Sequence, residues 1–148
     1  MRVVVQRVSE ATVRAGEERR GIGRGLLVLA GLERDDTEET VAWMAAKLAG
    51  LRVFEDAEGR MNLGLAEVGG AILAVSQFTL AGSVQRGRRP GFENAMAPEP
   101  ARELFQRFVH HLRATGLPVE TGFFREHMEV VLVNEGPVTF VVERPERL

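Results

Sequence analysis

The chain has 148 residues, of which 45% are apolar and 27% charged, and this length and composition predict a single globular domain covering residues 1–148. It contains no cysteine, which excludes a disulfide framework, thiolate zinc sites, iron–sulfur clusters and a cysteine nucleophile. The formal net charge of -2 argues against a protein that coats nucleic acid by bulk attraction, although local contact with RNA stays open.

The first third of the chain predicts strands followed by a helix. Arg2–Val8 is rich in β-branched residues and predicts a strand, and Ala11–Ala15 predicts a second one after the polar break Ser9–Glu10, so that the two would form a hairpin. The glycines of residues 21–25 then lead into Leu26–Ala30, a continuous apolar run typical of a strand buried on both faces. These glycines lack the spacing of a dinucleotide-binding loop and precede a strand, so we interpret them as a turn.

The acidic residues 35–39 predict the start of a helix. Asp36 is the expected N-cap, with Glu39 three residues later as in a capping box, and Gly50 stands where a C-terminal cap belongs. The apolar residues between them recur at helical spacing, namely Val41, Met44, Ala45 and Leu48.

The remaining elements follow from the same signals. Strands are expected at Leu51–Glu55, Arg60–Leu65, Ala71–Phe78, Val119–Thr121, Met128–Asn134 and Val138–Glu143, with a turn at Glu135–Gly136. A long loop is expected over residues 81–98, because that segment shows little periodicity and holds several Gly and Pro residues. A second amphipathic helix begins at Pro98 and is closed by Gly116 and Pro118.

The sequence argues against a metal site, against several common hydrolase and nucleotide-binding motifs, and against a membrane protein. His110, His111 and His127 are the histidines, and adjacent helical positions point about 100° apart, so the first two cannot chelate one metal ion and no metal site is expected. The sequence also lacks the motifs of zinc peptidases, nucleophile-elbow hydrolases and phosphate-binding loops. No apolar run approaches the length of a spanning helix and the first residues lack signal-peptide organisation, so a cytoplasmic protein without a membrane partner is expected.

Two segments place polar residues beside very apolar strands. In residues 76–80 the sequence Ser-Gln-Phe-Thr-Leu ends an apolar run, and its hydroxyl, amide and unpaired backbone N–H groups suit the placement of a carbonyl substrate, a water and an oxyanion. The simpler alternative is that these groups hydrogen-bond the exit of the strand. Residues 134–139, Asn-Glu-Gly-Pro-Val-Thr, would by themselves be a hairpin turn.

Both segments resemble the paired signature motifs of the D-aminoacyl-tRNA deacylases, enzymes of chiral proofreading. Supporting blocks follow in the order of that family, at residues 5–8, 25–29, 59–63, 87–90 and 119–122, so the resemblance covers essentially the whole chain. It implies an α/β fold in layered β/β/α form, with mostly hairpin-connected strands and two main helices. The sequence departs from the family between Phe124 and Met128, at Arg125, Glu126 and His127, and this departure would alter a loop or the pocket edge.

The resemblance also implies a site. Ser76, Gln77, Phe78 and Thr79 would form the catalytic pocket that holds the aminoacyl ester, with Met128 and Asn134 as further pocket candidates. Gly136 and Pro137 would form a cis peptide that rejects L-amino acids and reaches into the pocket of the other subunit of a homodimer. The substrate would be the aminoacylated 3' end of tRNA, glycyl-tRNA included, with no cofactor, no metal ion and no DNA partner.

Three points stay open from the residues alone. Thr79 could be a nucleophile, but no histidine or lysine is assigned beside it as a base, so we give it a positioning role. Arg86, Arg88 and Arg89 could contact tRNA phosphates or form a solvated loop. A dimeric module that binds small carboxylates or RNA ends without catalysis, or a hydrolase of other acyl esters, would use the same pocket.

Overall fold

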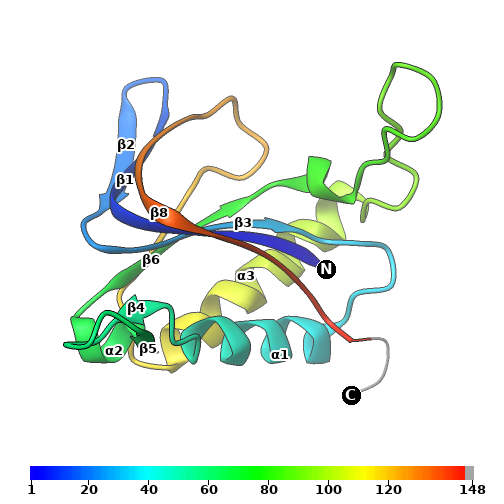
Figure 1. The fold of residues 1–148 in the computed structure, drawn as a ribbon. Coiled ribbons are helices and arrows are strands. Elements are labelled where there is room, and N and C mark those ends of the chain that lie inside the picture. The colour runs from blue at the N-terminus through cyan, green and yellow to red at the C-terminus, as the bar shows by residue number, and fades with distance from the viewer. Residues whose placement is uncertain (146–148) are drawn as a thin grey trace.

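Two β layers and one helical layer build the fold in the computed structural model, which describes residues 1–145 (Figure 1). The main sheet has the order β2-β1-β3-β6-β7, and β8 pairs with the other edge of β1. Its strands are β1 (Arg2–Ala15), β2 (Glu18–Ile22), β3 (Gly25–Gly31), β6 (Ala71–Ser76), β7 (Val119–Thr121) and β8 (Glu129–Glu143). The helices are α1 (Glu38–Ala49), α2 (Leu65–Val68) and α3 (Pro98–Ala114), with a 3-10 helix η1 (Phe78–Ala81) and a small sheet of β4 (Phe54–Glu55) and β5 (Met61–Leu63).

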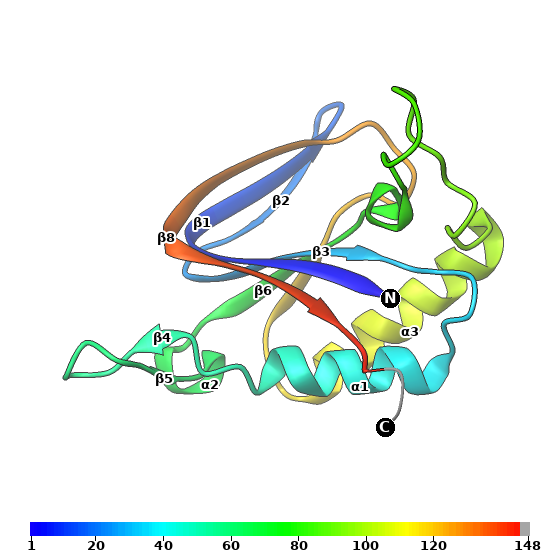
Figure 2. The same cartoon turned by 45° about the vertical axis from the view of Figure 1, so that its right-hand side comes forward.

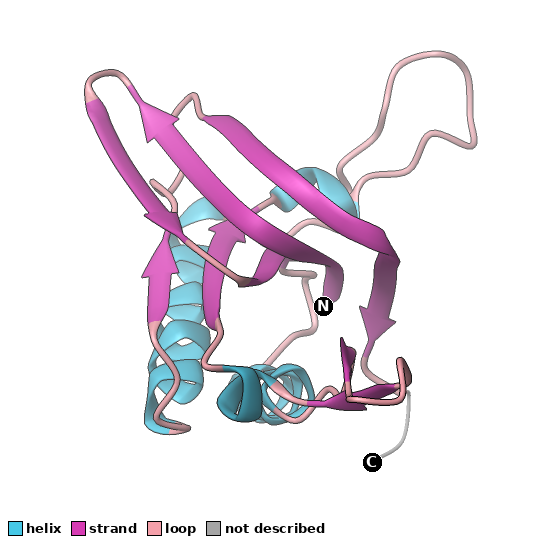
Figure 3. Ribbon diagram, turned by 60° about the vertical axis from the view of Figure 1, so that its left-hand side comes forward, coloured by secondary structure: helices cyan, strands magenta, loops and turns pink. Residues whose placement is uncertain are grey.

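Each face of the central strands is covered by its own apolar core. Along β3, Leu26 and Val28 point to the core shared with α1 and α3, whereas Leu27 points to a second core beneath the outer parts of β1 and β8. Figure 3 shows the helices gathered on one face while the long strands arch away from them. The two cores confirm the predicted β/β/α layering and explain why the central strands are continuously apolar.

The predicted hairpin within residues 2–15 is wrong. β1 is one strand that changes partner along its length: Arg2–Val8 pairs with β3 and Ala11–Ala15 pairs with β2. The polar residues Ser9 and Glu10 mark the point where it changes partner, and the register with β8 shifts there. The true hairpin joins β1 to β2, a strand the sequence did not predict because Glu18–Ile22 is charged and largely exposed at the sheet edge.

Both main helices form where predicted, with one corrected cap. The N-cap of α1 is Thr37 and not Asp36: the Thr37 hydroxyl accepts a hydrogen bond from the Thr40 backbone, and the Thr40 hydroxyl accepts one from the Thr37 backbone. Asp36 is engaged elsewhere, because its carboxylate accepts a hydrogen bond from the Glu33 backbone N–H at 2.7 Å. Gly50 caps the end of α1, and α3 begins at Pro98 as expected.

The predicted strands around residues 51–78 are shorter than expected. Strand pairing is limited to Phe54–Glu55 and Met61–Leu63, and Leu65 instead begins the short helix α2. The strand expected over Ala71–Phe78 ends at Ser76, where η1 takes over. Figure 2 shows β4, β5 and α2 at one end of the molecule and the loop of residues 82–97 at the other.

Among residues 1–145, no helix has the length and apolar composition needed to cross a membrane.

Candidate active site

A cavity of about 420 Å³ lies where the polar end of β6 meets the start of α3. Two segments of irregular structure close it, the loop around residues 92–96 and the loop of residues 122–128. Of the residues predicted for the site, Ser76, Gln77, Phe78 and Met128 line this cavity, and Thr79, Asn134, Gly136 and Pro137 do not. The other lining residues are Leu32, Phe92, Ala95, Met96, Pro98, Ala101, Phe124, Arg125 and Glu126.

The change from strand to 3-10 helix explains how the polar residues reach the cavity. Parallel pairing of β6 with β3 ends at Ser76 opposite Ala30, and the Gln77 N–H still donates to the Ala30 carbonyl at 2.8 Å. The chain then turns into η1, whose first N–H groups, those of Phe78 and Thr79, have no preceding turn to accept them. Amide, hydroxyl and backbone N–H donors are therefore concentrated at the C-terminal end of β6, a strand that is otherwise apolar.

Gln77 and Thr79 form one hydrogen-bonded unit. The Gln77 Nε2 donates to the Thr79 Oγ1 at 2.6 Å, and both side chains lie at the surface. Neither histidine nor lysine is among the residues that line the cavity. Within residues 1–145 no group of three His, Cys, Asp or Glu side chains is placed to hold a metal ion. The ionisable side chains that line the cavity are Arg125 and Glu126, and no contact joins either of them to the Thr79 hydroxyl, whose hydrogen-bond partner is Gln77.

Aromatic side chains form the rim and part of the wall. Phe78 is 54% exposed, and its ring packs edge-to-face against Phe92 with 5.3 Å between ring centroids. Phe124 contacts Phe105 of α3 at 6.3 Å between centroids. These rings and the neighbouring Leu32, Ala95 and Met96 give the cavity a partly apolar wall.

The departure from the family pattern lies at the cavity edge. Arg125 has a positive φ of 62°, and the Glu126 N–H closes a turn onto the Phe123 carbonyl at 3.2 Å. Arg125 and Glu126 line the cavity, whereas His127 is exposed outside it. Met128 returns to the cavity, and its sulfur accepts a hydrogen bond from the Phe123 N–H at 3.3 Å.

The predicted turn at Glu135–Gly136 is instead a bulge within β8. Both halves of β8 pair with β1, and Asn134 stands opposite Val8 while Thr139 stands opposite Gln6, so the residues between them loop out of the ladder. The sequence predicted a turn here because the Gly-Pro pair interrupts strand pairing. A bulge within one strand and a turn between two strands both produce this interruption. The Gly136–Pro137 peptide bond is cis.

Arg7 holds this bulge in place, a role that sequence reasoning missed. Its guanidinium is 5% exposed and donates to the Glu135 carbonyl at 2.9 Å and to the Val53 carbonyl at 2.7 Å. Glu55 and Glu135 supply carboxylates at 3.9 and 3.7 Å. An arginine within the apolar strand 2–8 was the available signal, since a charge buried in a sheet needs partners.

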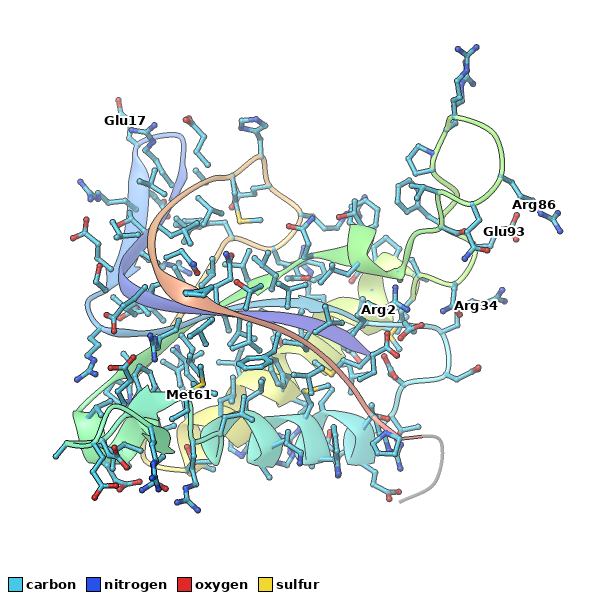
Figure 4. All side chains as sticks on the ribbon, in the orientation of Figure 1. Arg2, Glu17, Arg34, Met61, Arg86 and Glu93 are labelled. Atoms are coloured by element: carbon cyan, nitrogen blue, oxygen red, sulfur yellow. The ribbon has the colours of Figure 1, made fainter. Side chains whose placement is uncertain are left out.

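Arg86, Arg88 and Arg89 do not line the cavity. All three are exposed in the loop of residues 82–97, which is braced by backbone hydrogen bonds between Ser83 and Gly91. Figure 4 shows Arg86 on the outer side of this loop, pointing away from the body of the protein.

Comparison with known proteins gives a consistent result. The family model of D-Tyr-tRNA(Tyr) deacylase matches residues 4–143. The chain is similar to D-aminoacyl-tRNA deacylases of Symbiobacterium thermophilum, with 59% identity over 97% of this chain and 95% of the relative, and of Geobacter sulfurreducens, with 54% identity over 99% and 97%. A solved structure titled c-Myc DNA Unwinding Element Binding Protein superposes with a TM-score of 0.91 at 40% identity, covering 98% of this chain and 99% of that one.

Sequence similarity over nearly the full length therefore accompanies the shared fold, and the polar strand end that the sequence singled out lines the cavity between β6 and α3. The chain belongs to the D-Tyr-tRNA(Tyr) deacylase family of hydrolases.

Proposed function

We propose that this chain hydrolyses the ester that joins a D-amino acid to the terminal ribose of tRNA, releasing the free amino acid and the tRNA. The observation that carries the proposal is the cavity beside Ser76, Gln77 and Phe78, in a chain that belongs to a deacylase family. The cytoplasm, where aminoacyl-tRNA is made and used, is the expected location.

The proposed mechanism relies on placement more than on a covalent intermediate. An ester is an activated acyl group, so the enzyme mainly has to orient a water and stabilise the oxyanion of the tetrahedral intermediate. The backbone N–H groups of Phe78 and Thr79 are suited to the oxyanion, and the hydrogen bond from Gln77 to Thr79 fixes the amide beside the ester. The 2'-hydroxyl of the terminal adenosine helps to activate the water, so the RNA contributes to catalysis.

Chiral selection is assigned to Gly136 and Pro137 of a second subunit. These residues lie outside the cavity of their own chain, on a bulge that Arg7 holds in place. The partner's bulge would enter the cavity and exclude an L side chain or misplace its amino group. Asn134, whose side chain accepts a hydrogen bond from Gln6 at 3.5 Å, would stabilise the base of the bulge.

Glycine carries no side chain to be rejected, so glycyl-tRNA should also be cleaved. Release of labelled glycine from glycyl-tRNA at increasing enzyme concentration checks this expectation. Complete retention of the ester at high enzyme would contradict it.

The three arginines of the 82–97 loop are proposed to contact the acceptor end of the tRNA. Replacement of Arg86, Arg88 and Arg89 together by Gln should flatten the dependence of tRNA affinity on salt, because each phosphate contact releases counterions. An unchanged slope would assign these side chains to solvent.

Deacylation of D-tyrosyl-tRNA tests the enzyme against its alternatives. Purified protein should release D-tyrosine, whereas a binding module would retain the ester while binding the RNA. D-tyrosine ethyl ester is the control for a hydrolase of other acyl esters. Equal turnover of that compound and of D-tyrosyl-tRNA would contradict a requirement for RNA.

A further inference from the structure

A second cavity, of about 540 Å³, adjoins the first and has no role in the mechanism above. It lies between α3, the end of β7 and the loop that follows β7, and Phe124 and Glu126 line both cavities. Arg20, Arg102 and Arg113 line it, with His110 beside them. It brings together basic residues from two distant parts of the sequence.

Contacts with neutral groups hold these guanidinium groups in place. Arg20 lies over the Phe123 ring with its Cζ 4.2 Å from the centroid, and its Nη1 donates to the Thr121 Oγ1 at 3.0 Å. Arg102 lies over the Phe124 ring at 4.6 Å. In addition, the Nη2 of Arg113 donates to the Val119 carbonyl at 3.1 Å. Stacking on an aromatic ring leaves the donor edge of a guanidinium free for a ligand.

The positive charge of this cavity is not neutralised within the part of the chain that the structure describes. Among residues 1–145, no carboxylate oxygen lies within 4.0 Å of a guanidinium nitrogen of Arg20, Arg102 or Arg113. The acidic residue in the lining is Glu126, at the junction with the first cavity. Three arginines against one glutamate leave a local excess of positive charge in a chain whose net charge is -2.

We propose that this second cavity binds phosphate groups of the RNA chain whose aminoacylated end occupies the first cavity. The inference rests on the proposed function for the identity of the RNA, and on the arginine cluster for the ligand. Planar guanidinium groups match phosphate oxygens in pairs, and the shared wall at Phe124 places the nucleotides next to the terminal adenosine in reach. The side of α3 that bears Arg102 would then guide the RNA strand into the active site.

A comparison of two substrates tests this assignment. D-tyrosyl-tRNA has the phosphates, whereas D-tyrosyl-adenosine lacks them. Arg102→Gln and Arg20→Gln should therefore each lower kcat/KM for D-tyrosyl-tRNA, relative to kcat/KM for D-tyrosyl-adenosine, by about tenfold. Arg107→Gln is the matched control on the same helix, because Arg107 pairs with Glu38 of α1 and lies outside this cavity. An unchanged ratio, or an equal effect of the control, would overturn the proposal.

Direct binding separates this proposal from the proposed function. An uncharged RNA hairpin that copies the acceptor stem and 3' end should bind more weakly to Arg102→Gln and more tightly to Glu126→Gln, and Arg102→Gln should show a smaller salt slope. These results support the site even if no ester is cleaved. Equal affinity of wild type and Arg102→Gln for the hairpin, with an unchanged salt slope, would overturn it. Thermal melting of each variant confirms that it is folded.

Discussion

Thr79 carries the hydroxyl that the sequence offered as a nucleophile, but it lies outside the cavity lining and its surroundings argue against that role. Its hydroxyl accepts the hydrogen bond of the Gln77 amide at 2.6 Å, and the cavity lining contains no histidine or lysine. A hydroxyl without a base is a weak nucleophile near neutral pH. Gln77 and Thr79 are better explained as a pair that fixes the amide at the strand end.

Thr79→Ala should therefore lower kcat for D-tyrosyl-tRNA by less than about tenfold, whereas loss of a true nucleophile costs several orders of magnitude. The Gln77 amide remains in the variant and loses one acceptor. Single-turnover rates of ester loss measure the effect, with Thr79→Ser as the variant that keeps the hydroxyl. A drop of about a thousandfold in Thr79→Ala with full activity in Thr79→Ser would contradict the positioning role.

At the scale of the elements, Glu38 links the two main helices. Its two carboxylate oxygens share one bifurcated hydrogen bond from the Arg107 Nε–H, at 3.0 and 3.1 Å, and Oε1 also accepts one from the Arg107 Nη2 at 2.9 Å. The same Oε1 lies 2.8 Å from the His111 Nε2. The hydrogen bonds from Arg107 and then from His111 lower the pKa of Glu38 from 4.5 to about 2. A carboxyl whose pKa is lowered by folding stabilises the fold above its unfolded pKa and loses that contribution as the pH falls.

Glu38→Gln should therefore flatten the loss of stability between about pH 4.5 and pH 2. The size of the change should be small, because Glu38 and Arg107 are half exposed and solvent screens the pair. Urea midpoints at pH 5 and pH 3 for wild type and variant measure it. Glu103→Gln, an exposed glutamate on α3, controls for the removal of a surface charge. Parallel curves for wild type and Glu38→Gln would contradict the assignment.

Some elements of this fold were predictable from the sequence and others were not. α3, β3 and the polar strand end at Ser76 were predictable because their signals are local, namely helical spacing, a continuous apolar run and an abrupt change to polar residues. β8 was not predictable as a single strand, because one strand with a bulge and two strands joined by a turn have the same pattern of apolar residues. Its partner β1 is also distant in the sequence. The second cavity was also invisible to periodicity, since Arg20 and Arg102 meet through tertiary packing alone.

At the scale of the whole molecule, β8 presents an unpaired edge and exposed apolar side chains. Within residues 1–145, β8 pairs with β1 along one edge and with no strand along the other. Val131, Val133, Phe140 and Val141 on β8 are between 41% and 64% exposed. A long, exposed, apolar edge strand is a site of association. This surface supports the proposed homodimer and flanks the bulge at Gly136 and Pro137.

The double variant Val133→Asp/Val141→Asp should be monomeric and should lose most deacylase activity, because a charge buried in an apolar interface is costly and the partner's bulge would no longer enter the cavity. Sedimentation velocity and deacylation rates on the same samples measure both effects. Glu18→Asp/Glu120→Asp, on other strands, is the control pair. A fully active monomer would contradict a site completed by the second subunit.

The most direct test of the central claim, that this cavity hydrolyses D-aminoacyl esters of tRNA and rejects their L-forms, is the initial rate of ester loss from D-tyrosyl-tRNA and L-tyrosyl-tRNA under identical conditions. The two substrates share the RNA, the ester and every side-chain atom, so a difference in rate reports on chirality alone. The D-form should be cleaved at least about a hundredfold faster. Equal rates, or cleavage of neither form, would contradict it.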